Sequence, residues 1–354
     1  MNALIHRLTA GLPPGRIAFT FMLGALGGAA GLVLGLPLAV LLGSLVTVAL
    51  LASAGVRVAV PQSWRFALVP VIGVAIGGGF TEEVAAQAVL WWVTLAGLVL
   101  YIPLAHLLAY AIYRRLGGLS VTTAYWAAMP GGLLESLAMG EKAGADVAML
   151  TLLQFLRLNF CIILIPIGFS IATGQAVGSG GGAALPGSDV PIGPVDAVLL
   201  IAAAVLGVIL GQFARLPAAI ISGPVLASAL IHAAGLTKAV PPDWTIVVTQ
   251  WVVGTSLGTR FAGFGRTQLR RGLGISLLNT ALSLTLAAGF AAVLAPHVAE
   301  PAAAVFLAYA PGGISEMSLV AVSLQLSAVY VTAHHIARIV LSVLCAKAFA
   351  RLAE

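Results

Sequence analysis

Charged side chains are scarce in this chain: they make up 8% of its 354 residues, whereas a soluble domain carries about 25%. Hydrophobic residues make up 60%, and the mean hydropathy is +1.09. The sequence therefore predicts an integral membrane protein. The net charge of +6 is scattered between apolar runs and forms no basic tract, which favours topogenic charge over a nucleic-acid surface.

The sequence also lacks the motifs of cofactor and metal chemistry. Cys161 and Cys345 both fall inside apolar segments, so we expect buried thiols rather than a disulfide or a metal pair. No Walker loop or G-x-S-x-G element occurs, and the histidines follow no copper or zinc spacing. We therefore expect a protein that is not an enzyme, needs no cofactor and binds no nucleic acid directly.

An internal repeat sets the expected architecture. When the second half is aligned with the first, "LPLAVLLG" (36–43) matches "LPAAIISG" (216–223), and "VPQSW" (60–64) matches "VPPDW" (240–244). After a single inserted residue the match continues, and "PGG" at 130–132 meets "PGG" at 311–313. We call this pairing the repeat alignment. The chain is predicted to be a duplication, with a first repeat at 1–173, a Gly- and Pro-rich linker at 174–194 and a second repeat at 195–354.

Each repeat contains five apolar runs that we interpret as helices of an all-α membrane protein. In the first repeat, every run except the third is long enough to cross the roughly 30 Å hydrocarbon layer, and the third is short and rich in glycine. The runs lie near 17–35, 37–56, 66–80, 84–113 and 147–172, and near 195–213, 217–236, 246–259, 272–295 and 328–349.

Loop charge indicates how these helices are threaded. If the Pro-Gly-Gly segments at 118–142 and 302–324 enter and return on one side, every Arg-rich loop lies inside and the acidic loops lie outside. The acidic loop at 82–83 then corresponds to the basic loop at 260–271, so the repeats are inverted. We expect ten transmembrane helices, two re-entrant hairpins and cytoplasmic termini, in a multi-pass protein of the bacterial inner membrane. Alternatively, Pro-Gly-Gly kinks a helix that crosses.

The Pro-Gly-Gly breaks are predicted to expose polar backbone inside the membrane. Such backbone is tolerated only where protein or a water-filled cavity covers it. A half-helix that begins after the break directs free N–H groups toward the middle of the membrane, which is how inverted-repeat transporters build substrate sites. The predicted substrate-binding residues of the breaks are Pro130, Gly131, Gly132, Pro311, Gly312 and Gly313.

A glutamate lies shortly beyond each break. Glu135 and Glu316 have two interpretations that the sequence leaves open. Each carboxylate can cap the N-terminus of its half-helix. Alternatively, it is a proton or cation site, because a carboxylate inside a membrane is costly to keep without a use.

An arginine lies in the middle of the last helix of each repeat. Arg157 and Arg338 each have a polar residue one turn earlier, Gln154 or His335, which gives one helix face a polar stripe. One interpretation is an ion pair that locks the hairpin glutamate to the helix. The other is an anchor for a substrate carboxylate or phosphate, which suits a planar cation.

Glycine and tryptophan patterns predict packing rather than chemistry. The tryptophans at 64, 91, 92 and 244 are predicted to lie at the membrane interface. Small residues one helical turn apart predict close helix packing at Gly73 and Gly77, and again at Gly254 and Gly258.

With "MPGGLLES…GADVAMLTLLQFLR…IP" and "APGGISEMSL…HIARIV" in tandem halves, the chain resembles the AbrB family of bacterial membrane proteins from about residue 20 to 350. The family label implies regulation of gene expression, and some members carry the name ammonia monooxygenase. Neither activity follows from these residues, which include no recognisable metal ligand set and no soluble DNA-binding domain. The two copies also differ: residues 144–146 read Gly-Ala-Asp, whereas 325–327 read Gln-Leu-Ser.

We interpret the sequence as a secondary transporter or exporter of a small anionic or zwitterionic metabolite, with proton coupling as one option. The first alternative is a membrane sensor that regulates gene expression indirectly, and a membrane monooxygenase comes third. The expected partners are the lipid bilayer and a small-molecule substrate. The sequence leaves open the substrate and whether the chain forms a homo-oligomer.

Overall fold

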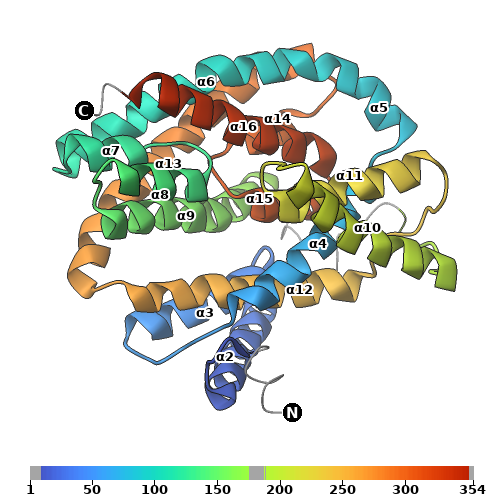
Figure 1. Ribbon diagram of the computed structural model, residues 1–354, viewed down its shortest axis with the longest axis horizontal. Coiled ribbons are helices and arrows are strands. Elements are labelled where there is room, and N and C mark those ends of the chain that lie inside the picture. The colour runs from blue at the N-terminus through green and yellow to red at the C-terminus, as the bar shows by residue number, and fades with distance from the viewer. Residues whose placement is uncertain (1–8, 175–186, 188, 351–354) are drawn as a thin grey trace. The chain divides into compact units, whose positions relative to one another are not determined.

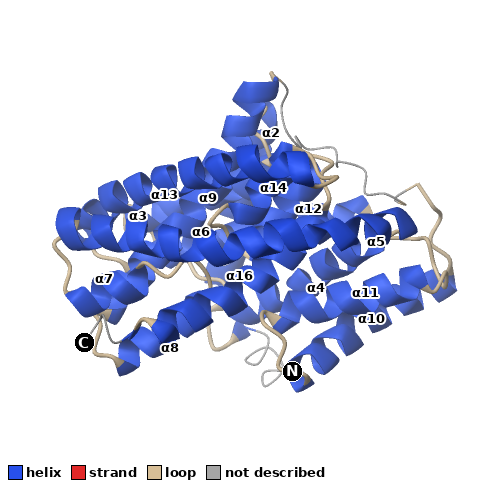
Figure 2. Cartoon of the chain, turned by 90° about the horizontal axis from the view of Figure 1, so that it is seen from above, coloured by secondary structure: helices blue, strands red, loops and turns tan. Residues whose placement is uncertain are grey.

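The computed structural model describes residues 9–174, 187 and 189–350, and helices are the regular secondary structure of this part of the chain (Figure 1, Figure 2). Both chain ends, whose cytoplasmic location was predicted, and most of the predicted linker lie outside the described residues. The described part carries the all-α fold that the apolar runs predict.

Six helical stretches are long and apolar enough to cross a membrane within the described ranges. They are α2 (Pro14–Val33), the stretch Val84–Leu116, α9 (Val147–Thr173), α10 (Pro194–Phe213), the stretch Thr267–His297 and α16 (Ala328–Ala348). The second stretch comprises most of α5 (Glu82–Ala88), η1 (Val89–Trp91), α6 (Trp92–Ala111) and η2 (Ile112–Leu116). The fifth comprises most of α13 (Arg266–Leu294) together with η4 (Ala295–His297).

Four further predicted helices are present but shorter. They are α3 (Ala39–Ser53), α4 (Gln62–Gly78), α11 (Ala219–Ala233) and α12 (Asp243–Thr259), which ends in η3 (Arg260–Gly263). At 1.5 Å per residue, the 15 residues of α3 extend about 22 Å, less than the roughly 30 Å of a hydrocarbon layer. Six crossings therefore rest on length and composition, and the count of ten remains a prediction.

The chain divides into two compact units, and each unit takes helices from both halves of the sequence. Unit 1 comprises Met1–Glu82, Ile163–Phe264 and Ser318–Gln325. Unit 2 comprises Glu83–Ile162, Gly265–Met317 and Leu326–Glu354. Sequence repeats and compact units are thus different divisions of the same chain.

In unit 1, matched glycines bring the first two helices of each repeat together. A Cβ on Gly43 of α3 would collide with the backbone of Gly27 in α2. At the corresponding position of the repeat alignment, a Cβ on Gly223 of α11 would collide with Gly207 of α10. Only a residue without a side chain permits this approach, so the same close packing is present in both copies.

The third helix of each repeat packs on the second helix of the other repeat. In α4, a Cβ on Gly73 would lie 2.8 Å from the carbonyl oxygen of Ile221 in α11. In α12, a Cβ on Gly258 would lie 2.9 Å from the carbonyl oxygen of Leu45 in α3, and α3 and α12 run side by side (Figure 1). The contacts are reciprocal, and the small-residue pattern at Gly73 and its equivalents is confirmed as close helix packing.

Unit 2 shows the same exchange between repeats. His334 Nε2 of α16, in the second repeat, lies 2.8 Å from Thr94 Oγ1 of α6, in the first. Ser276 Oγ of α13, in the second repeat, donates to the carbonyl oxygen of Leu153 in α9, in the first, at 3.4 Å. A face of each half is therefore covered by the other half.

Burial corrects one prediction about the tryptophans. Trp91 is only 7% exposed and packs edge-on against Tyr330, so it is a core residue and the prediction of an interfacial Trp91 is wrong. Trp244 and Trp92 are exposed, and their location at a membrane interface stays a prediction. Both cysteines are free thiols, with Cys161 buried and Cys345 partly so.

Candidate functional site

The first Pro-Gly-Gly segment is a hairpin of two short helices. The first hairpin consists of α7 (Val121–Ala127), the break at 128–132 and α8 (Leu133–Lys142). Ser136 Oγ donates to the carbonyl oxygen of Trp126 at 2.6 Å, so α8 folds back beside α7. At the open end, the backbone N–H of Asp146 donates to Thr123 Oγ1 at 2.9 Å. The chain therefore returns to the place where the hairpin began.

The second Pro-Gly-Gly segment closes in the same way with different residues. The second hairpin consists of α14 (Ala302–Tyr309), a break at 310–313 and α15 (Ile314–Ser323). Glu300, just before α14, accepts a hydrogen bond from the side chain of Ser327, just before α16. Ser327 corresponds to Asp146 in the repeat alignment, whereas Glu300 corresponds to Leu119, so only one residue of each closing contact is at an equivalent position.

Gly132 makes the first break possible. It is the N-cap of α8 and lies in the left-handed region, with φ +71°, where a side chain would be strained. Pro130 and Gly131 are buried beside it, and a Cβ on Gly131 would lie 3.1 Å from Ser342 Oγ in α16. The break is thus enclosed by protein rather than exposed to lipid.

Two polar side chains of α9 bind the carbonyl oxygens at the end of α7. Arg157 Nη1 donates to the carbonyl oxygen of Met129 at 2.7 Å. Gln154 Nε2 donates to the carbonyl oxygens of Ala127 and Met129 at 3.0 and 3.1 Å. These groups satisfy the last carbonyls of a short helix, whose C-terminal dipole attracts a cation.

The second repeat makes the equivalent contacts. Arg338 Nη1 donates to the carbonyl oxygen of Ala310, and its Nη2 donates to that of Gly312 at 2.6 Å. His335 Nε2 lies 3.0 Å from the carbonyl oxygen of Leu307. Ala310 corresponds to Met129 in the repeat alignment, so the two arginines hold equivalent carbonyls and each pairs with a different polar neighbour.

Both guanidinium groups are buried without a balancing carboxylate among the described residues. Arg157 and Arg338 are 4% and 2% exposed, and their hydrogen bonds go to backbone carbonyls and to His335. The two guanidinium charges are near enough to repel each other, and Tyr101 lies close to both. Both Nε atoms, the Tyr101 hydroxyl and Ser342 Oγ are buried without a hydrogen-bond partner. Two buried cations with unused donors form a place that an anion would stabilise.

The two glutamates lie on the other side of each break. Glu135 Oε2 would lie 2.9 Å from a Cβ on Gly132, so this carboxylate folds back over the N-cap residue of α8. The Glu316 carboxylate folds back over Gly313 and accepts a hydrogen bond from Ser315 Oγ at 2.9 Å. This geometry agrees with the capping interpretation, in which an acid offsets the positive end of a half-helix.

The structure therefore brings the predicted residues together around the two Pro-Gly-Gly breaks, which both belong to unit 2. The breaks, Gln154, Arg157, His335 and Arg338 converge on the carbonyl ends of α7 and α14, whereas the glutamates face the N-terminal ends of α8 and α15. The ion-pair interpretation of the arginines is not what the described residues show. Sequence reasoning missed Tyr101 and Ser342, because one buried hydroxyl in an apolar run carries no pattern. No cluster of metal-ligating side chains occurs in the part of the chain that the structure describes.

Comparison with known proteins agrees with the resemblance noted in the sequence. A family model described as "Transition state regulatory protein AbrB" matches residues 40–354. The chain is 25% identical over 288 residues to "Putative regulator AbrB" of Escherichia coli (strain K12), and the alignment covers 81% of each chain. It is 27% identical over 281 residues to "Uncharacterized protein YhjN" of Bacillus subtilis (strain 168), covering 74% of this chain and 71% of that one.

Proposed function

The chain belongs to the AbrB family of helical membrane proteins, and we propose that it is a secondary transporter or exporter of a small anionic or zwitterionic metabolite. The observation that carries the proposal is the pair of buried arginines. Each guanidinium is held by a carbonyl at a helix break, and neither is neutralised by a carboxylate of the described residues. A charge of this kind is expensive inside a membrane protein unless a ligand uses it.

The proposed topology is ten crossings and two re-entrant hairpins, with the repeats inverted in the bacterial inner membrane and both termini in the cytoplasm. The reciprocal glycine contacts support it, because two copies related by a two-fold axis exchange partners in this way. The four shorter helices would cross where neighbouring helices or local thinning of the bilayer accommodate their length.

In the proposed mechanism, Arg157 and Arg338 bind an anionic group of the substrate with their unused donors. The carbonyls of Met129 and Ala310 orient the guanidinium groups, and Gln154 and His335 fix the ends of the short helices. Glu135 and Glu316 would take up and release protons at the breaks, which couples transport to the proton gradient. No covalent chemistry, cofactor or direct nucleic-acid contact is part of this proposal.

The test is flux in proteoliposomes that contain only the purified protein. We would measure uptake of small organic acids and amino acids, together with proton movement, for wild type, Arg157→Ala and Glu135→Gln. Arg271→Ala is the matched control, because Arg271 also donates to a backbone carbonyl, that of Gly117 at 3.0 Å, outside both hairpins. We expect Arg157→Ala to reduce flux at least tenfold and Arg271→Ala to leave it unchanged.

The glutamate variant separates coupling from binding. Glu135→Gln should retain substrate binding but lose proton movement. Gel filtration would show whether Arg157→Ala folds. If it does not, Arg157→Lys, which keeps the charge, takes its place in the flux measurement. If flux is unaffected by Arg157→Ala, the site lies elsewhere.

A membrane sensor is the second candidate, favoured by the name of the Escherichia coli relative, which describes that protein as a regulator. A sensor would bind the same anion at the arginines and pass the signal to a partner. Saturable binding by wild-type protein that shows no flux for any substrate would support the sensor and contradict the transporter.

A further inference from the structure

The side-chain amide of Gln154 has a fixed orientation. Its Nε2 donates to the carbonyl oxygens of Ala127 and Met129 at 3.0 and 3.1 Å. It also lies 3.2 Å from Ser136 Oγ. Because Ser136 Oγ gives its own hydrogen to the carbonyl oxygen of Trp126, at 2.6 Å, it accepts from the amide. All of these partners are acceptors, so the nitrogen must face them and the oxygen, Oε1, keeps both of its lone pairs.

This oxygen is an unused acceptor beside an unused donor. Gln154 is fully buried, and its Oε1 has no hydrogen-bond partner among the described residues. Arg157 Nη1 donates to the same carbonyl oxygen of Met129 that Gln154 binds, at 2.7 Å, so the two side chains are neighbours. Arg157 Nε is also buried and unpartnered. One small molecule can therefore meet the amide oxygen of Gln154 and the guanidinium of Arg157 together.

The remaining unpartnered groups of this site are donors or hydroxyls. They are Arg338 Nε, the Tyr101 hydroxyl and Ser342 Oγ. The charges of Arg157 and Arg338 are near enough to repel each other, which favours an anion that contacts both. A molecule that satisfies the whole set carries a carboxylate for the two guanidinium groups and, in addition, a hydrogen-bond donor for Gln154.

The second repeat has no equivalent acceptor. His335, which corresponds to Gln154 in the repeat alignment, uses both of its ring nitrogens. Its Nε2 lies 3.0 Å from the carbonyl oxygen of Leu307, and its Nδ1 lies 3.1 Å from Arg338 Nη2. A guanidinium can only donate, so Nδ1 is the acceptor of that bond and is already occupied. The site is therefore asymmetric, and a donor on the substrate has its partner on the side of α9.

The charge of the site favours a hydroxyl over an ammonium group as that donor. An ammonium would bring a third positive charge beside two guanidinium groups that no carboxylate of the described residues balances. A hydroxyl donates the same hydrogen bond without a charge. Because Gln154 and Arg157 hold the same carbonyl oxygen, the hydroxyl must also be close to the carboxylate, on the carbon next to it.

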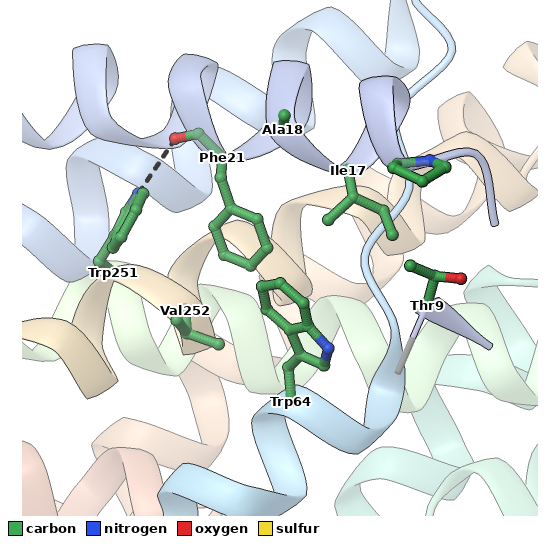
Figure 3. A pocket seen from close by; sticks show the side chains of 8 residues that line it. Thr9, Ile17, Ala18, Phe21, Trp64, Trp251 and Val252 are labelled. Carbon is green, nitrogen blue, oxygen red and sulfur yellow. Dashed lines mark hydrogen bonds between the residues drawn. The ribbon is translucent and has the colours of Figure 1, made fainter. Parts of the chain in front are cut away.

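The cavity of unit 1 offers no comparable groups. Its volume is about 330 Å³, and its lining is almost entirely apolar. The aromatic rings of Phe21, Trp64 and Trp251 form much of its wall (Figure 3). Trp251 Nε1 donates to the carbonyl oxygen of Phe21 at 3.2 Å, so that donor is already used. The residues that line this cavity carry no charge, and a carboxylate would find no counter-charge there.

We propose that the substrate anion is a small 2-hydroxy carboxylate. Its carboxylate accepts hydrogen bonds from Arg157 and Arg338, and its hydroxyl donates to Gln154 Oε1. This inference rests on the proposed function, because it takes the two arginines as the substrate site, and it adds the chemical class of the substrate.

The test compares molecules of one size that differ in a single group: lactate, propionate and alanine. Each would be titrated into full-length protein in detergent, with both enantiomers of lactate and with sodium chloride as the control for ionic strength. The unfolding midpoint as a function of concentration gives each affinity. We expect one enantiomer of lactate to bind about tenfold more tightly than propionate, which leaves the buried Gln154 oxygen unpaired. Alanine should also bind more weakly than lactate, because of its ammonium group.

The variant Gln154→His gives the first repeat the side chain that the second has at this position. Lactate should then bind no more tightly than propionate. Gln212→His is the matched control, because Gln212 is an exposed residue of α10 in unit 1, and it should keep the preference for lactate. Gel filtration would show whether Gln154→His folds. If it does not, Gln154→Met takes its place, and the comparison of the three acids in wild type needs no variant.

The outcomes separate this inference from the proposed function. Equal binding of lactate and propionate, tighter binding of alanine, or a preference that survives Gln154→His would overturn the hydroxy acid and leave the anion site standing. The hydroxy acid alone is also overturned if none of these acids binds but another anion shows flux that Arg157→Ala reduces. If neither binding nor flux is found for any anion, the proposed function falls with it.

Discussion

At the scale of single residues, the two repeats use different side chains to satisfy the backbone carbonyls at equivalent helix ends. The end of each first half-helix has carbonyls that its own helix cannot satisfy. In the first repeat an arginine and an amide supply the donors, and in the second an arginine and an imidazole do so. The arginine is common to both because it brings a permanent charge along with its donors. The site is therefore symmetric in charge and asymmetric in hydrogen bonding.

Glu300, at the base of the second hairpin, gives a pH prediction. It is 6% exposed and lies outside the candidate membrane spans. Burial raises the pKa of the Glu300 carboxyl, and the hydrogen bond from Ser327 opposes this rise. The folded protein therefore binds this proton more tightly than the unfolded chain, whose glutamate pKa is about 4.3. The stability from Glu300 is complete below that value and is lost as pH rises through the raised pKa.

The variant Glu300→Gln should consequently melt at a higher temperature than wild type at neutral pH. The difference should shrink as the pH approaches about 4, where wild-type Glu300 is protonated. Thermal unfolding in detergent at several pH values measures this directly. Glu141→Gln, which removes an exposed carboxylate, is the control and should follow wild type at every pH. A constant difference across the pH range would mean that folding does not shift the pKa of Glu300.

The sequence predicted which residues gather at the site but not what they bind. The repeat places Arg157 and Arg338 at equivalent positions, and the break before each hairpin helix is visible as Pro-Gly-Gly. The hydrogen-bond partners of these arginines are backbone carbonyls. Every residue has a backbone carbonyl, so the sequence does not indicate which ones an arginine binds. The sequence left an ion pair and a substrate anchor open, whereas in the structure each guanidinium donates to carbonyls at the helix end.

At the scale of elements, close packing between helices depends on a few glycines. A Cβ on Gly77 of α4 would lie 2.6 Å from Ser228 Cβ of α11, well inside ordinary contact distance. Gly77→Ala should force the two helices apart and destabilise the protein by about 1–3 kcal/mol, the usual cost of overpacking. Its counterpart Gly258→Ala, whose Cβ would lie 2.7 Å from Val48 Cβ, should behave alike.

The control for this prediction is a helical glycine that touches nothing. Gly289→Ala in α13 adds a Cβ with no atom within 4 Å, so it should be neutral or slightly stabilising, because alanine favours a helix. Unfolding midpoints in detergent compare the three variants. If Gly77→Ala is as stable as Gly289→Ala, α4 and α11 are not held by this contact.

The boundaries of the elements were largely predictable, whereas their partners were not. Apolar runs predicted α10 near 195–213, and the helix covers Pro194–Phe213. The small-residue spacing in α4 predicted a closely packed face. It did not indicate that α11, from the other repeat, would cover this face. A small-residue pattern predicts that a helix packs closely, but not which helix that is.

At the scale of the whole molecule, the proposed inverted topology can be tested by accessibility. Glu82 and Gly263 occupy equivalent positions in the two repeats, and both are exposed. In a background of Cys161→Ser/Cys345→Ser, the variants Glu82→Cys and Gly263→Cys should react with an impermeant maleimide from opposite sides of the membrane. We expect Glu82→Cys to be labelled in intact cells and Gly263→Cys only in inverted vesicles. Labelling from one side for both would mean parallel repeats.

The exchange of helices between repeats also has a consequence for biosynthesis. The face of α4 at Gly73 is completed by Ile221, which lies far later in the chain, in the second repeat. At about 5–20 residues per second, a ribosome needs roughly 7–30 s to supply that partner. Throughout this interval the face of α4 at Gly73 has no helix packed on it. The delay is longer for α3, because α12, which packs on it, is made later still. Two half-chains made as separate polypeptides should accordingly recover a native core only when both are present in one membrane.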